Sequence, residues 1–231
     1  MLMSHSRCFA LSLNDIGRTT IIEHHIRLKP DARPVYRPGF KRFSQPELQF
    51  IEGEIQKQLA AGIIREMDGP WCAPVTLAMK KNGKYRFCVA YIGLNSQTER
   101  ESWPLPNIEE VLDGLGGFEF YTTLDGFSGF NTIPIEKDDQ HLTTFRTPWG
   151  TFCYTVMPFG LKNAPHTYCR YMHKAFAHLL TKSVKTYMDD IAVSSHTFEQ
   201  HMNDVNQALD AAEVGDIACQ FAKGTLLSKR S

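Results

Sequence analysis

Neither sign of charge is in excess in this sequence. Its 25 Lys and Arg residues balance 25 Asp and Glu residues, so the formal net charge at pH 7 is zero. The overall positive field that draws many proteins to nucleic acids is therefore missing, and any contact with a polyanion must be local. A solvated surface is the simpler explanation of each basic cluster in the chain. The candidate clusters are Arg33, Arg37, Lys41 and Arg42, then Lys80, Lys81, Lys84 and Arg86, and finally Lys223, Lys229 and Arg230.

Cysteine pairs with a recognisable spacing are also missing. The six cysteines are scattered through the chain, with no C-x-x-C pair and no Cys/His pattern typical of a zinc site. A chain of 231 residues is large enough to fold without disulfides. These features favour a reducing compartment, which is the cytoplasm or the nucleus.

Long apolar runs are absent as well. No run could cross a bilayer, and the first residues contain only a short apolar stretch, shorter than the core of a signal peptide. We therefore expect no membrane partner. The sequence is 42% hydrophobic and 22% charged, which is typical of a folded globular protein, and its length fits one large domain or two interlocked subdomains.

Local patterns alternate between helical and strand-like segments. The capping box of Ser44 and Glu47 predicts a helix that ends at Gly62, and Asn82-Gly83 predicts a tight β-hairpin within 74–91. The remaining patterns predict helices over 107–115, 165–180 and 197–209, a strand over 118–125, and hairpins over 144–157 and 185–194. Because tight turns join several strand pairs, we expect an α+β fold with helices on one face of a sheet.

Two adjacent carboxylates, Asp189 and Asp190, lie between the two arms of the last predicted hairpin. Two like charges about 4 Å apart repel by roughly 4 kcal/mol at a protein surface, so solvent or a cation must offset the repulsion. A polar hairpin turn in solvent is one explanation. The other depends on Asp125, which ends the strand predicted over 118–125. If the two strands are neighbours, three carboxylates converge and form an oxygen-rich site suited to Mg²⁺ or Mn²⁺.

Several stretches carry a more specific signal. The sequence reads Y-M-D-D at 187–190, T-L-D-G-F-S-G-F at 123–130, T-F-R-T-P-W-G at 144–150 and V-M-P-F-G-L-K-N-A-P at 156–165. In this order they closely resemble the reverse transcriptase of gypsy-type long-terminal-repeat retrotransposons, and the resemblance covers roughly residues 24–223. The Y-M-D-D stretch alone would be a weak signal, whereas the ordered set is specific.

The resemblance implies the fingers and palm of a right-hand polymerase, in which the palm is an antiparallel sheet with helices on one face. It assigns residues 26–99 and 133–163 to the fingers, and 100–132 and 164–222 to the palm. Residues 1–25 show no clear period, so we expect an N-terminal tail or linker there. Residues 223–231 would be a truncated start of the thumb, so we expect the thumb to be largely absent.

The resemblance also implies a set of site residues. Asp125, Asp189 and Asp190 would be catalytic and would bind two Mg²⁺ or Mn²⁺ ions together with the carbonyl of Gly126. The residues implied for nucleotide binding are Lys81, Arg86, Ser128, Gly129, Phe130 and Phe159. Those implied for template or primer contacts are Gly160, Pro165, Tyr187 and Met188. Lys80 and Lys84 remain alternatives to Lys81, and packing in the core remains an alternative role for Phe130.

The implied activity is that of an RNA-directed DNA polymerase, a nucleotidyltransferase. Its partners would be an RNA or DNA template with a primer and deoxynucleoside triphosphates. The ribonuclease H and integrase modules of a parent polyprotein are further candidate partners, and an active element would place the protein in a virus-like particle. The alternative is a truncated or decayed retroelement fragment that keeps the palm fold without catalysis and at most binds nucleic acid. Ala90 and Ile92 favour this alternative, because the family usually has an acid and a base there.

Overall fold

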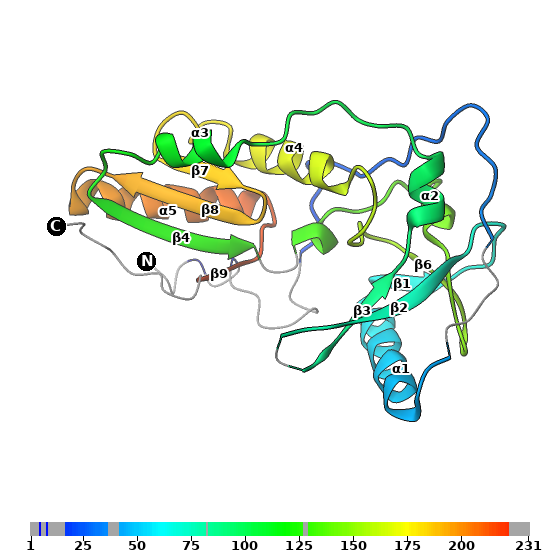
Figure 1. Cartoon of the computed structure of the whole chain (residues 1–231). Coiled ribbons are helices and arrows are strands. Elements are labelled where there is room, and N and C mark those ends of the chain that lie inside the picture. Colours follow the sequence, from blue (N-terminus) through cyan, green and yellow to red (C-terminus); the bar gives the residue numbers. More distant parts are fainter. Residues whose placement is uncertain are drawn as a thin grey trace. The chain divides into compact units, whose positions relative to one another are not determined.

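The computed structural model describes residues 5, 8, 17–36, 42–81, 83–126 and 129–221. The chain divides into two compact units, each built from segments that are far apart in the sequence. The first unit takes its residues from 1–22, 102–133 and 165–231, and the second from 23–101 and 134–164. Figure 1 shows the elements of both, coloured along the chain.

The second unit contains a five-stranded sheet. All neighbouring strands are antiparallel except β2 and β5, which run parallel. The strands lie in the order β1 (Ile64–Glu66), β6 (Gly150–Tyr154), β5 (Phe145–Thr147), β2 (Ala73–Met79) and β3 (Tyr85–Val89). The predicted hairpin is confirmed as the β2–β3 pair, and the backbone N–H of Lys80 donates to the carbonyl of Lys84 at 2.8 Å. Gly83 has φ +77°, whereas Asn82 lies outside the described residues.

Helix α1 (Gln45–Ala60) begins and ends as its sequence predicts. At its start, the backbone N–H of Ser44 donates to Glu47 Oε2 at 2.7 Å. The helix ends before Gly62, whose φ of +63° suits a residue without a side chain. Ile51 and Ile55 lie four residues apart, so they share one face of the helix, and both are fully buried. A shorter helix, α2 (Ile92–Gln97), follows β3.

The first unit is organised around a four-stranded antiparallel sheet. Its strands lie in the order β7 (Val184–Tyr187), β8 (Asp190–Ser195), β4 (Phe120–Gly126) and β9 (Cys219–Phe221). Its helices are α3 (Ile108–Asp113), α4 (Ala164–Phe176) and α5 (Phe198–Val214). In Figure 1, α5 crosses one face of this sheet. Helix α4 is shorter than predicted, because the backbone N–H of Leu179 bonds the carbonyl of Phe176 at 2.8 Å and closes a turn there.

A buried polar network joins α5 to the sheet. His201 Nε2 lies 2.8 Å from Thr122 Oγ1 of β4, and His201 Nδ1 lies 3.1 Å from Ser195 Oγ of β8. Ser195 Oγ donates to Asp204 Oδ2 at 2.6 Å. Each of these buried groups has a partner, as burial of polar atoms requires. In the parts of the chain that are described, no helix is both long and apolar enough to cross a membrane.

Candidate functional site

The three aspartates lie at one end of the β4–β8 strand pair, in the first unit. Asp125 of β4 is directly opposite Asp190 of β8 in the strand register. Asp189 belongs to the turn between β7 and β8, and its carbonyl accepts a hydrogen bond from the backbone N–H of Gly126 at 2.8 Å. The two strands are therefore neighbours, as the hypothesis of a shared carboxylate site requires.

The turn that carries Asp189 is tight. Tyr187 and Asp190 face each other across β7 and β8, so only Met188 and Asp189 connect the strands. Met188 has φ +53°, which is uncommon for a residue with a side chain, so the turn holds a locally unfavourable backbone conformation. Tyr187 and Met188 are half-buried, and Cys169 Sγ of α4 lies 3.8 Å from Met188 Sδ.

Electrostatic repulsion is present within the aspartate group. Burial, followed by the negative charges of Asp189 and Asp190, raises the pKa of Asp125 above its ordinary value. Burial and then the charge of Asp189 raise the pKa of Asp190. Asp125 is half-buried, whereas Asp189 and Asp190 are exposed, so all three are open to an incoming ion. A set of carboxylate oxygens that destabilise one another suits a hard divalent cation such as Mg²⁺ or Mn²⁺, so these residues fit the expected ions.

A second group of possible ligands lies in the other unit. Single ligand atoms of Glu23, His25 and Glu136 all lie within 4.8 Å of one another, a spacing that the three aspartates do not reach. These side chains are exposed or half-buried, and His25 Nδ1 also lies 3.8 Å from Asp139 Oδ2. A solvated surface cluster accounts for the group.

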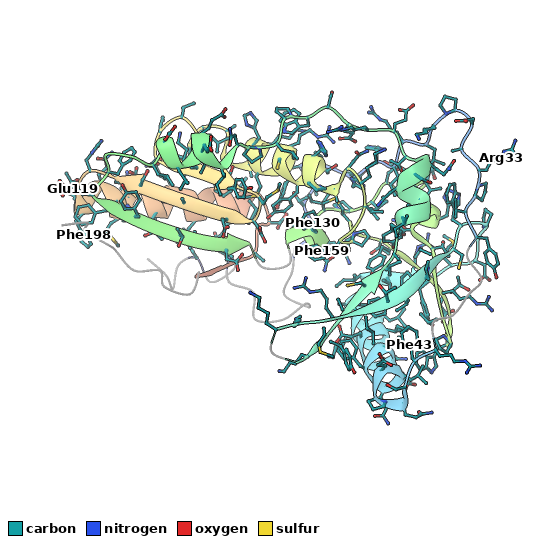
Figure 2. All side chains as sticks on the ribbon, viewed as in Figure 1. Arg33, Phe43, Glu119, Phe130, Phe159 and Phe198 are labelled. Atoms are coloured by element: carbon teal, nitrogen blue, oxygen red, sulfur yellow. The ribbon has the colours of Figure 1, made fainter. Side chains whose placement is uncertain are left out.

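Gly129 and Phe130 follow β4 in a short 3₁₀ turn, Gly129–Thr132. Gly129 is buried, and Phe130, labelled in Figure 2, is half-buried. The ring of Phe130 stacks on that of Tyr168 from α4, with 4.9 Å between ring centroids. Ser128, the remaining residue implied for this segment, lies outside the described residues.

The basic residues implied for nucleotide binding belong to the second unit. Lys81 lies in the β2–β3 turn, and Arg86 lies on β3 opposite Ala78. Both are exposed, as are Lys80 and Lys84, so the turn presents a group of positive charges to solvent.

The 157–163 loop, also in the second unit, is held by an asparagine that sequence reasoning missed. Asn95 Nδ2 of α2 donates to the carbonyl of Gly160 at 2.8 Å, and the backbone N–H of Lys162 donates to Asn95 Oδ1 at 2.8 Å. Gly160 has φ +93°, and Phe159, which Figure 2 labels, is an exposed side chain (62%). Pro165 follows this loop in the sequence, in the first turn of α4, and belongs to the first unit.

Comparison with known proteins identifies relatives of the chain. A family model described as reverse transcriptase (RNA-dependent DNA polymerase) matches residues 78–228. The retrovirus-related Pol polyprotein from transposon 297 of Drosophila melanogaster is 31% identical over 218 residues, which are 92% of this chain and 20% of that polyprotein. The transposon Tf2-3 polyprotein of Schizosaccharomyces pombe is 32% identical over 190 residues, 81% of this chain and 14% of that polyprotein. The chain thus spans a fifth or less of these relatives.

Solved structures share the fold. The foamy viral protease-reverse transcriptase in complex with RNA/DNA hybrid matches 98% of this chain and 30% of that chain, with a TM-score of 0.85 and 20% sequence identity. The same protein in complex with double-stranded DNA matches 98% of this chain and 47% of that chain, with a TM-score of 0.84 and 21% identity. The α+β polymerase fold predicted from the sequence is confirmed. The family match over most of the chain and the retrotransposon relatives lead to one conclusion: the chain belongs to the reverse transcriptase (RNA-dependent DNA polymerase) family.

Proposed function

We propose that this chain is an RNA-directed DNA polymerase domain that adds deoxynucleotides to the 3′ end of a primer. The observation that carries the proposal is the placement of Asp125 opposite Asp190, with Asp189 in the adjoining turn. Membership of the reverse transcriptase family supports it. Carboxylates held by paired strands are well placed for this chemistry, because a rigid scaffold keeps their spacing fixed.

The proposal gives the two units different roles. Residues 26–99 and 133–163 would act as the fingers, and residues 100–132 and 164–222 as the palm that carries the aspartates. Residues 1–25 would be a tail or linker. The proposed start of the thumb, 223–231, lies outside the described residues.

Asp125, Asp189 and Asp190 would hold two Mg²⁺ or Mn²⁺ ions, with the carbonyl of Gly126 as a further ligand. Bound there, the ions would favour ionisation of the primer 3′-hydroxyl and neutralise charge as this oxygen bonds the α-phosphate and pyrophosphate leaves. The contribution of the protein is mainly positional: the strand pair keeps Asp125 and Asp190 opposite each other, and the Gly126 hydrogen bond fixes the turn that carries Asp189.

The remaining site residues are proposed to bind the nucleotide and the nucleic acid. The forked guanidinium of Arg86 and the mobile charge of Lys81 suit a triphosphate. Phe130 would lie beneath the sugar and reject a ribose 2′-hydroxyl by collision. The backbone of Ser128 and Gly129 and the side chain of Phe159 complete the proposed nucleotide contacts, and Gly160, Pro165, Tyr187 and Met188 the proposed template and primer contacts.

The proposed partners are an RNA or DNA template, its primer and deoxynucleoside triphosphates. Because the related polyproteins are much longer than this chain, ribonuclease H and integrase modules are proposed as companions within a parent polyprotein. Its proposed place of action is the cytoplasm or nucleus, within a virus-like particle if the element is active.

Primer extension on matched RNA and DNA templates tests the proposal. The folded 231-residue chain, supplied with Mg²⁺ and all four deoxynucleotides, should extend a labelled DNA primer on both. Asp189→Asn should reduce the rate by about 100-fold or more, because one ion ligand is lost. Asp113→Asn is the matched control, since Asp113 is an exposed carboxylate at the end of α3 in the same unit. A folded wild-type chain that extends no primer would instead support the inactive-fragment alternative.

A further inference from the structure

Tyr168 of α4 is the immediate neighbour of Phe130. Its side chain is fully buried, and the two rings stack with 4.9 Å between centroids and 19° between planes. Tyr171, one helical turn later, meets the ring of Tyr168 edge-on at 5.9 Å. The hydroxyl of Tyr171 in turn donates to the carbonyl of Gly215 at 2.6 Å, which anchors this aromatic group within the first unit.

Two glycines leave the space that Tyr168 fills. A Cβ added at Gly126 would lie 2.9 Å from the Tyr168 hydroxyl oxygen. A Cβ added at Gly129 would overlap that oxygen and lie 2.8 Å from two ring carbons of Tyr168, Cε2 and Cζ. Tyr168 therefore packs against the backbone at the end of β4 and again at the residue before Phe130.

The flat ring of Tyr168, rather than its hydroxyl, explains why an aromatic residue occupies this place in α4. Among the described residues, the hydroxyl is buried without a hydrogen-bond partner, which is unfavourable for a polar group. The ring, by contrast, gains a near-parallel contact with Phe130, and such contacts restrict the orientation of both rings.

A side chain can exclude a ribose hydroxyl only if it does not move aside when the hydroxyl arrives. Phe130 is half-buried, and the near-parallel ring of Tyr168 packs against one of its faces. We propose that Tyr168 is a positioning residue for the choice of sugar, and that it acts by holding the ring of Phe130 in place. This inference rests on the proposed polymerase function and on the proposed role of Phe130.

Single-nucleotide extension with a deoxynucleotide and the matching ribonucleotide tests this role. Tyr168→Leu removes the stacked ring and should raise the ribonucleotide-to-deoxynucleotide ratio of kcat/KM about tenfold, the scale of a small steric change in a substrate pocket. Tyr168→Phe keeps the ring and should leave the ratio within about threefold of wild type. Tyr168→Met should behave like Tyr168→Leu, because the flexible methionine side chain fills much of the volume without a flat face. It provides a second test if the leucine variant does not fold.

The double variant Phe130→Val/Tyr168→Leu should show no further rise over Phe130→Val alone, because Tyr168 acts only through Phe130. Unchanged ratios in folded Leu and Met variants that still extend with deoxynucleotides would overturn the inference and leave the proposed function standing. An equal shift in Tyr168→Phe would also overturn it, since the hydroxyl would then be responsible. A folded wild-type chain without polymerase activity would overturn both.

Discussion

Asp125 is the residue at which stability and proposed function conflict most clearly. Its pKa is raised by burial and by the charges of Asp189 and Asp190, so the folded state disfavours its ionised form. The ionised carboxyl therefore lowers the free energy of unfolding. This loss is absent below the ordinary pKa of about 3.9 and is complete once the pH exceeds the raised pKa of the folded state. We predict that Asp125→Asn raises the thermal midpoint of the metal-free protein at pH 7 by no more than about 2 °C, because solvent screens the group.

Thermal unfolding in a chelator, followed from pH 7 to pH 4, checks this prediction. The advantage of Asp125→Asn should shrink as the pH falls, because the wild-type carboxyl becomes protonated. Added Mg²⁺ should stabilise the wild type and not the variant. A lower midpoint for Asp125→Asn than for wild type at pH 7 without metal would contradict the electrostatic account, and Asp113→Asn should show no gain.

Phe130 carries the proposed discrimination against ribonucleotides. Phe130→Val should open space beneath the sugar and raise relative ribonucleotide incorporation by roughly tenfold or more, which corresponds to about 1.4 kcal/mol. The measurement is the ratio of kcat/KM for a matched pair of nucleotides. Phe198→Val, which shortens an exposed phenylalanine of α5 in the same unit, is the control. An unchanged ratio in an active Phe130→Val enzyme would assign Phe130 to packing alone.

A sequence signals a candidate site residue most clearly when the chemistry of that residue is unusual for its surroundings. Two adjacent aspartates between strand-forming residues, as in Asp189 and Asp190, draw attention because their repulsion must be offset. Tyr168 gives no such signal, since an aromatic residue in an amphipathic helix is most simply explained as core. Asn95 was missed for a different reason: it bonds Gly160, 65 positions away, and no local pattern reports a contact of that range.

Helix α5 is held to its sheet through a titratable side chain. Burial lowers the pKa of His201, and the charge of Asp204 opposes this only in part. Thr122, Ser195 and, through Ser195, Asp204 surround the imidazole. Because the pKa is lower in the folded state, stability is fully present above the unfolded pKa of about 6.5 and is lost as the pH falls below it.

Denaturant unfolding between pH 7.5 and pH 5 measures this effect. As the pH falls, the free energy of unfolding of the wild type should decrease, and His201 should contribute at most about 1.4 kcal/mol per pH unit to this decrease. His201→Gln should be less stable at pH 7.5 but should show a flatter pH dependence. His178→Gln, at an exposed position after α4, should keep the wild-type slope. An equal slope in His201→Gln would mean that other groups cause the pH dependence.

Elements formed by local sequence were predicted well, whereas most long-range pairings were not. The β2–β3 and β7–β8 hairpins depend on turns of a few residues, which leave clear signals. The parallel β2–β5 pair and the addition of β9 to β4 join segments distant in the sequence, and β9 has only three residues. Patterns of hydrophobicity do not specify such partners, because they show which residues are buried but not which strand a given strand pairs with.

The division of the whole molecule into two units is similarly hidden from composition. Each unit combines separate stretches of chain, so no shift of composition along the sequence marks a boundary. The zero net charge likewise does not indicate whether the chain binds a nucleic-acid template, since a local cluster such as the β2–β3 turn can supply positive charge. The order of several specific stretches, rather than any bulk property, is what predicted the family.

At the scale of the whole molecule, the proposed catalyst uses aspartates from two paired strands for metal-dependent nucleotide addition. Rapid-quench measurement of single-deoxynucleotide addition to an RNA-templated primer, across a range of Mg²⁺ concentrations, tests it most directly. We predict that the rate saturates with Mg²⁺, disappears in a chelator and falls by about 100-fold or more in Asp190→Asn but not in Asp113→Asn. A folded wild-type chain that adds no nucleotide, or an Asp190→Asn variant that adds it at the wild-type rate, would contradict the account.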